Sequence, residues 1–210
     1  MAIRYEKHDM LKVGITGGIG SGKSVVSGIF DLLRIPVYNS DARARQIMEH
    51  SEHVRTQIID SFGTQAYDEN GSLNRDFIAS QVFSNKKMLS QLNAIVHPAV
   101  GDDFEQWCST QEGKPYILKE AALIFEAGIN KFLDKVILIF APEELRISRV
   151  MSRDEANEES VQSRIENQWS DRKKAPLADY IIVNDGDHSL LRQTLEIHKL
   201  LVEYAQKSAK

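Results

Sequence analysis

One short segment of the chain has the residue types and the spacing of a phosphate-binding loop. It reads Gly17-Gly18-Ile19-Gly20-Ser21-Gly22-Lys23-Ser24 and satisfies the pattern G-x-x-x-x-G-K-[S/T] in full. Glycines let successive main-chain N–H groups turn toward phosphate oxygens, and the N-terminus of a following helix adds a favourable dipole. We expect Lys23 to reach the β- and γ-phosphates of ATP, and the Ser24 hydroxyl to bind Mg²⁺.

The flanking residues support this interpretation over that of a plain glycine-rich turn. The apolar run Lys12–Thr16 has the composition of a strand, and the run Val25–Phe30 after the loop suits a helix. A nucleotide-dependent switch is an alternative, but it requires Asn-Lys-x-Asp. The nearest match, Asn130-Lys131-Phe132-Leu133-Asp134, has one residue too many. A small kinase fits the loop better.

Two carboxylates follow further predicted strands. The strand Pro36–Asn39 leads into Ser40-Asp41, and ligands of an open parallel sheet bind at the carboxyl ends of its strands. We predict that Asp41 orients the attacking hydroxyl and accepts its proton, although Ser40-Asp41 could also simply cap the next helix. Glu120 ends a third strand and is expected to reach Mg²⁺ through water or to contact the acceptor. Glu126 is expected only to cap a turn.

Three arginines share one face of a predicted helix, since Arg146, Arg149 and Arg153 are spaced i, i+3 and i+7. Guanidinium groups stabilise the charge on a transferring phosphoryl group, and we predict this catalytic role for Arg149 and Arg153. Arg146 is expected to lie on a solvated face, paired with Glu143.

The other residues whose side chains could take part in chemistry are expected to have structural roles. His50 and His53 have no further ligands at metal-binding spacing, so two solvated histidines are expected. Cys108 is expected to be a small core residue. Because it is the single cysteine, it excludes an internal disulfide and favours a reducing compartment.

The elements that must position these groups alternate between strands and helices. Runs that are apolar on both alternating sets of positions predict strands of a parallel sheet covered by helices: Lys12–Thr16, Pro36–Asn39, Tyr116–Lys119, Val136–Phe140 and Tyr180–Val183. Helical spacing occurs over Ser24–Leu33, Asp41–His50, Val54–Phe62, Arg75–Phe83, Lys86–Val96, Pro98–Gln111, Glu143–Ser152 and Leu190–Gln206. The alternation predicts an α/β fold.

The uneven spacing of the strands predicts two additions to this core. Roughly 75 residues separate the second and third strands, far more than a crossover needs, so a helical insertion is predicted from about Asp41 to Gly113. The polar interval Arg153–Ala178 has alternating charges and no apolar periodicity. It predicts an exposed, mobile flap, which is either a lid or a solvated helical hairpin without a role in chemistry.

The composition narrows the class of protein. The 210 residues are 42% hydrophobic and 27% charged, which argues against disorder. With 26 Lys and Arg against 30 Asp and Glu, the net charge of −4 gives no reason to expect a nucleic-acid or membrane partner. The longest apolar run, Val136–Ala141, is shorter than the roughly 20 residues that cross a bilayer. The charged N-terminus lacks the apolar core of an export signal, so a cytoplasmic location is expected.

Several motifs together resemble the dephospho-coenzyme A kinase family of P-loop kinases, over nearly the whole chain from Val13 to about Leu201. The string Thr-Gly-Gly-Ile-Gly-Ser-Gly-Lys is more specific than a general phosphate loop. The other segments that carry the resemblance are Ser40-Asp41-Ala42-Arg43-Ala44-Arg45, Leu92-Asn93-Ala94-Ile95-Val96-His97-Pro98-Ala99-Val100, Arg149–Asp154, Arg164–Gln168 and Ala178–Asn184.

The resemblance implies transfer of the ATP γ-phosphate to the ribose 3′-hydroxyl of 3′-dephospho-coenzyme A, giving coenzyme A and ADP. It implies one domain over residues 12–210: a core of about 12–40, 114–152 and 179–210, an acceptor-binding insertion of about 41–113 and a lid of about 153–178. It casts Asp41 as the catalytic carboxylate, and Arg149 and Arg153 as lid-side phosphate ligands. His97 belongs to the acceptor subdomain.

The same resemblance suggests that Asn184 contacts the adenine of ATP, with a turn-forming Asn-Asp-Gly as an equal alternative. One segment departs from the family pattern. The family commonly reads Asp-x-Pro-Leu-Leu-x-Glu after its third strand, whereas this chain has Glu120-Ala121-Ala122-Leu123-Ile124-Phe125-Glu126. The role of Glu120 therefore stays open between Mg²⁺ and the acceptor, and the oligomeric state is open as well.

Overall fold

Five strands form one sheet in the order β2-β3-β1-β4-β5 in the computed structural model, which describes residues 10–83 and 85–208. The strands are β1 (Leu11–Thr16), β2 (Val37–Asn39), β3 (Tyr116–Glu120), β4 (Lys135–Phe140) and β5 (Tyr180–Val183). Each of the five predicted strands is confirmed to within one residue at either end. The α/β prediction is confirmed with them.

The central strand β1 aligns the carboxyl ends of its neighbours. It pairs in parallel with β3, with Ile15 opposite Glu120, and in parallel with β4, with Thr16 opposite Leu138. Strand β4 pairs in parallel with β5, with Phe140 opposite Val183. The segments that follow these strands therefore leave from the same edge of the sheet, where ligands of such folds bind.

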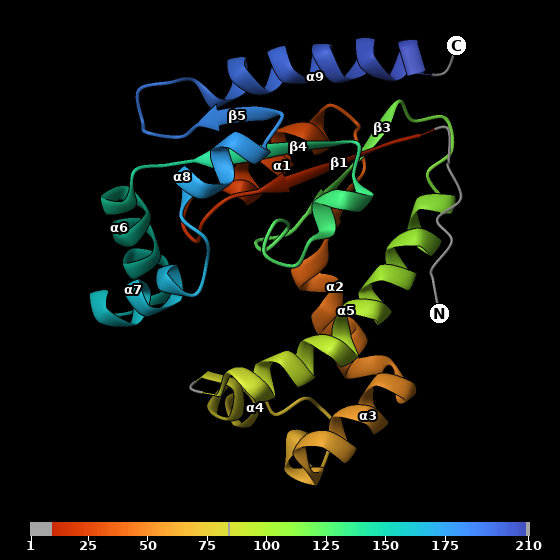
Figure 1. Ribbon diagram of the computed structural model, residues 1–210, viewed down its shortest axis with the longest axis vertical. Helices are drawn as coiled ribbons and strands as arrows, with labels where there is room; N and C mark the ends of the chain where they lie inside the picture. The colour runs from red at the N-terminus through yellow and green to blue at the C-terminus, as the bar shows by residue number, and fades with distance from the viewer. Residues whose placement is uncertain (1–9, 84, 209–210) are drawn as a thin grey trace. The chain divides into compact units, whose positions relative to one another are not determined.

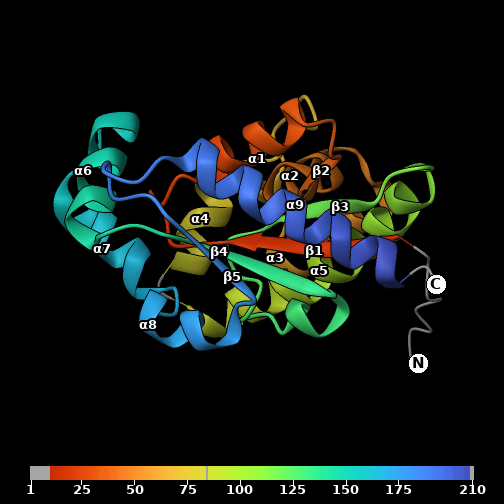
Figure 2. The ribbon, with the colours of Figure 1, turned by 90° about the horizontal axis from the view of Figure 1, so that it is seen from above.

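Both faces of the sheet are covered, as the apolar strands predict. Helices α1 (Lys23–Leu32) and α9 (Leu190–Ser208) pack against one face (Figures 1 and 2). The core on this side consists of Leu11, Val13, Ile15, Val26, Phe30, Ile35, Tyr116, Leu118, Ile137, Ile139, Ile182, Ile197 and Leu201. The segment after β3 covers the other face with Ile124 and Phe125, and includes the short helix η2 (Ile129–Phe132). Gly14 is in close contact with this layer, because a β-carbon would lie 2.6 Å from Leu133 Cδ1, which would have to move.

Residues 39–110 form a second compact unit of the chain. It contains α2 (Ser40–His50), α3 (Glu52–Phe62), the short helix η1 (Thr64–Ala66), α4 (Arg75–Phe83) and α5 (Lys86–Ser109). Its own apolar core includes Val54, Ile58 and Phe62 of α3. Cys108 is buried in α5, as predicted.

The prediction of two helices on either side of His97-Pro98 is wrong, because α5 runs through Pro98 without interruption. Proline removes one N–H from the helical ladder and clashes with the carbonyl four residues earlier, so it usually ends or bends a helix. Here the buried Val96, Val100 and Phe104 hold both halves of α5, which is bent in its middle (Figure 1).

The charged interval after β4 is more ordered than its composition predicts. Helix α6 (Glu143–Asp154) packs beside α7 (Glu158–Glu166), and the short helices α8 (Asp171–Lys174) and η3 (Ala175–Leu177) lead into β5 (Figures 1 and 2). The prediction of an exposed flap is wrong for Val161, Asp171 and Lys174, which are all buried. Among residues 10–83 and 85–208, no helix has the length and apolar character that crossing a membrane requires.

Candidate active site

The phosphate-binding loop, residues 17–22, connects β1 to α1 at the carboxyl edge of the sheet. Gly22 precedes the helix with φ +93°, a left-handed conformation that glycine adopts without strain. The Lys23 ammonium group donates to the main-chain oxygens of Gly17 at 2.9 Å and Gly18 at 3.4 Å. The lysine that is expected to bind phosphates therefore lies folded over the loop itself.

Two loop glycines lie directly against α6. A β-carbon on Gly18 would collide with Nη1 of Arg146. A β-carbon on Gly20 would lie 2.5 Å from the main-chain oxygen of Arg146, and Gly20 has φ +77° as well. The first turn of α6 therefore packs directly on the phosphate-binding loop.

Ser24 and Glu120, whose roles the sequence predicts separately, face each other at the carboxyl edge of the sheet. The Ser24 hydroxyl donates to Oε1 of Glu120 at 3.5 Å, and Glu120 is buried with 6% of its surface exposed. Within the described residues no group of three or more His, Cys, Asp or Glu side chains is placed to hold a metal ion. One hydroxyl and one carboxylate nevertheless suit Mg²⁺, which is bound through one or two carboxylates together with substrate phosphates and water.

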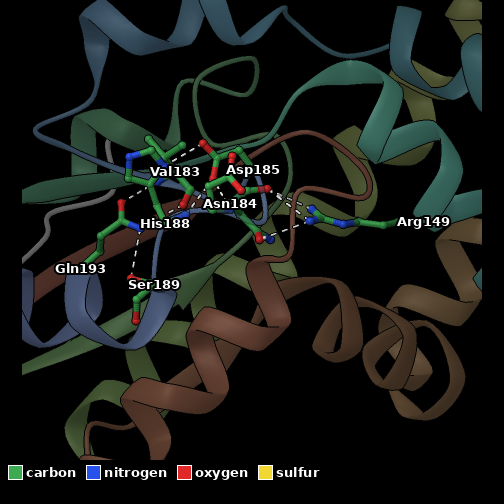
Figure 3. Close-up of polar contacts among 8 residues, drawn as sticks. Arg149, Val183, Asn184, Asp185, His188, Ser189 and Gln193 are labelled. Carbon is green, nitrogen blue, oxygen red and sulfur yellow. Dashed lines mark hydrogen bonds and ion pairs between the residues drawn. The ribbon is translucent and has the colours of Figure 1, made fainter.

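Asn184 supports the loop from the end of β5. Its side-chain amide donates to the main-chain oxygen of Ser21 at 2.7 Å. Arg149 reaches Asn184 from α6 and donates to its main-chain oxygen at 3.2 Å and 3.3 Å, and to Oδ1 at 3.4 Å (Figure 3). Both polar atoms of the Asn184 side chain are thus engaged with protein, so its predicted contact with adenine stays a prediction.

The turn after Asn184 is formed by Asp185. Its Oδ1 accepts from the main-chain N–H groups of Asp187 at 3.0 Å and His188 at 3.1 Å. The hydrogen bond from His188 N–H is the main cause that lowers the pKa of Asp185 to about 2. Gln193 of α9 holds the strand end in place, because its side chain accepts from Val183 N–H and donates to Val183 O (Figure 3).

The three arginines of α6 have three different environments. Arg153 is exposed and paired with its neighbour Asp154 at 2.7 Å, and its hydrogen bond lowers the pKa of Asp154. The prediction of a solvated Arg146 is wrong, because its residue is only 6% exposed and its guanidinium packs on Gly18. The predicted pairing of Arg146 with Glu143 is present at 3.3 Å.

Sequence reasoning missed that Gln168, in the polar interval Arg153–Ala178, contacts the loop. The side-chain oxygen of Gln168 accepts a hydrogen bond from the main-chain N–H of Ile19 at 2.9 Å. Glu126 likewise does more than cap a turn, because Oε1 accepts from Trp169 N–H at 2.9 Å. A glutamine in a polar interval and a glutamate in a loop carry no local signal of such long-range contacts.

The second unit carries the remaining predicted residues. Asn39, and not Ser40 or Asp41, caps α2, because its Oδ1 accepts from Ala42 N–H at 2.9 Å. Asp41 is exposed in the first turn of α2, and His97 is exposed in α5. Arg43 is held by Asp103 of α5, with 2.8 Å from Nε to Oδ2. His50 and His53 are both exposed, as predicted.

Comparisons with known proteins identify a kinase family that matches most of the chain. The family model described as dephospho-CoA kinase matches residues 11–189. A dephospho-CoA kinase of Porphyromonas gingivalis is 42% identical over 189 residues, which cover 90% of this chain and 93% of that one. One from Bacteroides fragilis strain YCH46 is 37% identical over 193 residues, with 92% and 94% covered.

Solved structures have the same fold. The crystal structure of TT1252 from Thermus thermophilus superposes with a TM-score of 0.81 at 32% identity, covering 92% of this chain and 98% of that one. The dephospho-CoA kinase from Campylobacter jejuni superposes with a TM-score of 0.67 at 23% identity, with the same coverage, and shows the fold alone. On the match of residues 11–189 and the identities to its curated relatives, the chain belongs to the dephospho-CoA kinase family.

Proposed function

We propose that this protein transfers the γ-phosphate of ATP to the ribose 3′-hydroxyl of 3′-dephospho-coenzyme A, with Asp41 as the general base and Mg²⁺ as the metal ion. The products are coenzyme A and ADP, so the reaction is the last step of coenzyme A biosynthesis. The family assignment supports this activity. The observation that carries the chemistry is the loop geometry, in which Lys23 and the Ser24–Glu120 pair lie at the carboxyl edge of the sheet.

ATP binding requires Lys23 to change partners. Its ammonium group now donates to the carbonyl oxygens of Gly17 and Gly18. Phosphate oxygens carry negative charge, so they attract the ammonium group by a charge–charge interaction that the neutral carbonyl oxygens do not offer. We therefore expect the lysine to leave these carbonyls for the β- and γ-phosphates. The loop N–H groups other than those of Ile19 and Ser21, which donate to Gln168 and Gly18, are expected to bind the same oxygens.

Ser24 and Glu120 are the residues that would hold Mg²⁺, Ser24 directly and Glu120 through water. The ion, when bound, neutralises charge on the β- and γ-phosphate oxygens. The extra methylene of Glu120 relative to the family's aspartate lengthens its reach toward this position, and burial fixes it at the end of β3. On this proposal Glu120 binds Mg²⁺ through water beside the hydroxyl of Ser24. The alternative is that Glu120 contacts the acceptor.

The transfer itself breaks one bond and forms another. The acceptor 3′-oxygen bonds to the γ-phosphorus, the bond from that phosphorus to the β–γ bridging oxygen breaks, and ADP leaves with the bond's electron pair. The hydroxyl proton passes to the Asp41 carboxylate. The acceptor-binding unit is residues 41–113, with His97 among its contacts, and the predicted role of Arg149 and Arg153 is to stabilise charge on the transferred group. The place of action is the cytoplasm, where ATP is available.

An assay of ADP release tests this proposal against its rivals. Purified protein is supplied with ATP and Mg²⁺ together with dephospho-coenzyme A, with nucleoside monophosphates, or with no acceptor. Turnover that depends on dephospho-coenzyme A is expected. Turnover driven by a nucleoside monophosphate would identify a kinase with another acceptor, and acceptor-independent hydrolysis of GTP would identify a nucleotide switch.

The variant Asp41→Asn tests the proposed role of Asp41 as the general base. We expect kcat to fall by at least a factor of 100, in the range typical of general base catalysis, while the Kd of an ATP analogue stays within twofold. Asp76→Asn is the matched control, because Asp76 is likewise exposed in the first turn of a helix of the same unit. Unchanged turnover in Asp41→Asn would remove this residue from the mechanism.

A further inference from the structure

Three buried charged residues lie near the phosphate loop without a part in the proposed reaction. Arg146 is 6% exposed, Asp171 is 8% exposed and Lys174 is fully buried. Burying a charge costs several kcal/mol unless partners compensate for it. Apolar residues of similar volume in the same place often make a protein equally stable or more stable. Buried charges beside a catalytic loop therefore call for a functional explanation.

Asp171 and Lys174 belong to a segment that we call the strap, residues 168–174. One side of the strap is fastened to the segment after β3. Oε1 of Glu126 accepts from Trp169 N–H at 2.9 Å and forms an ion pair with Lys174 Nζ at 2.9 Å. The strap is thereby held to the same stretch of chain that begins with Glu120.

The strap also contacts the phosphate loop, in two ways. Gln168 accepts from the main-chain N–H of Ile19 at 2.9 Å. Asp171 forms an ion pair with Arg146, with 4.0 Å from Oδ2 to Nε, and Arg146 packs on Gly18. The strap therefore reaches the first half of the loop directly through Gln168 and indirectly through Arg146.

The Asp171 carboxylate lies among cations and is poorly compensated. Neither of its oxygens, nor Nε of Arg146, has a hydrogen-bond partner within the part of the chain that the structure describes. Burial raises the pKa of the Asp171 carboxyl above its usual range, while the charges of Arg146, Lys174 and Lys23 act in the opposite direction. Its negative charge thus acts on the loop lysine as well as on the arginine.

We infer that Asp171 is a positioning residue for ATP binding: its carboxylate holds the guanidinium of Arg146 against Gly18 and so keeps the first half of the phosphate loop in shape for the nucleotide. This inference rests on the proposed function only in taking ATP as the ligand. Gly18 has no side chain of its own, so it is held by hydrogen bonds to its carbonyl from Ser21 N–H and Lys23 and by the packing of Arg146. The strap, itself part of the predicted lid, ties that support to the segment after Glu120.

The variant Asp171→Asn keeps the size of the side chain and removes its charge. We expect the Kd of a non-hydrolysable ATP analogue, measured without acceptor, to rise about tenfold, because Arg146 loses its buried counter-charge. The KM for ATP rises in parallel, whereas the KM for the acceptor stays within twofold. A merely structural role would lower the melting temperature and the active fraction and leave both constants unchanged.

Two further variants separate positioning from loss of stability. Glu143→Gln is the control, because it removes the exposed partner of Arg146, and exposed ion pairs contribute little. The double variant Arg146→Gln/Asp171→Asn leaves no unpaired charge from this pair. The double variant should have a higher melting temperature than Asp171→Asn. It should nevertheless bind the ATP analogue as weakly as Asp171→Asn does.

The inference is overturned if folded Asp171→Asn binds the ATP analogue within twofold of the unchanged protein, or if Glu143→Gln weakens binding equally. Binding of the analogue is measured without acceptor. A wrong assignment of the acceptor would therefore leave this result intact, and a failed inference would leave the turnover assay intact.

Discussion

The side-chain amide of Asn184 donates a hydrogen bond to the main-chain oxygen of Ser21 across 2.7 Å. The same nitrogen lies so close to Gly22 that a β-carbon on Gly22 would collide with it. Arg149 holds Asn184 from the other side (Figure 3). The end of β5 therefore supports the second half of the phosphate loop, as Arg146 supports the first.

Replacing Asn184 by Ala should weaken ATP binding. One hydrogen bond to the loop is lost, worth about 0.5–1.5 kcal/mol, so the KM for ATP should rise about fivefold. The KM for the acceptor should change little, and steady-state kinetics with each substrate varied in turn would measure both constants. Asn70→Ala in an exposed turn is the control. Equal KM values for ATP in both variants would contradict a supporting role for Asn184.

Gly18→Ala should destabilise the protein and weaken ATP binding, whereas Gly28→Ala should do neither. A β-carbon on Gly18 meets the buried guanidinium of Arg146, while a β-carbon on Gly28 of α1 meets nothing within 4 Å. Gly28→Ala should raise the free energy of unfolding by about 0.5–1 kcal/mol, because alanine favours the helix. Gly18→Ala should lower it by about 1–3 kcal/mol and raise the KM for ATP. Chemical denaturation and ATP titration of both variants test the pair. A Gly18→Ala protein with unchanged stability and KM for ATP would show that the guanidinium of Arg146 moves aside at no cost.

Glu120→Gln should increase the Mg²⁺ concentration that half-maximal turnover needs. A neutral amide keeps the shape and the contact with Ser24 but removes the charge that attracts the hydrated ion. We expect an increase of about tenfold, together with full recovery of the unchanged enzyme when Mg²⁺ is restored after chelation by EDTA. If instead the KM for dephospho-coenzyme A rises and the Mg²⁺ requirement does not, Glu120 serves the acceptor.

The melting temperature should depend on pH through His198, whose Nδ1 lies 2.6 Å from the hydroxyl of buried Tyr116. Burial lowers the pKa of His198, so on acidification the unfolded chain binds a proton before the folded one does. This contribution to stability is complete above the ordinary histidine pKa of about 6.5 and decreases as the pH falls below it. His198→Gln should therefore lose less melting temperature between pH 7.5 and 5.5 than the unchanged protein. Exposed His53→Gln is the control, and parallel pH profiles for all three proteins would contradict the assignment.

The strands could be predicted closely because their signal is local. A strand covered on both faces carries apolar residues on both alternating sets of positions, and each of the five predicted runs of this kind is a strand of the sheet. Pro98 shows where local reasoning fails. A proline in an isolated peptide ends a helix, but packing of the buried residues on both sides keeps α5 continuous.

The residues of the candidate site likewise fall into those that local sequence predicts and those that it does not. The loop residues and the place of Glu120 at a strand end were predictable, because they depend on one strand and the residues directly after it. The contact between Ser24 and Glu120 was found only in the structure. Gln168 and Asp171 were not, because a polar residue in a charged interval has the same local signal whether it is solvated or buried. Their partners Ile19 and Arg146 are distant in the sequence or on another element.

Sequence alone determined the phosphate chemistry and the family, because the loop's glycines, Lys23 and Ser24 are neighbours within one strand–loop–helix unit and their spacing can be read locally. It also placed Arg146, Arg149 and Arg153 on one face of α6. Only the tertiary structure decided what each arginine touches: Arg146 packs on Gly18, Arg149 binds Asn184, and Arg153 stays in solvent. Helical spacing orders side chains around an axis, but the path of that axis past the loop depends on the whole packed sheet.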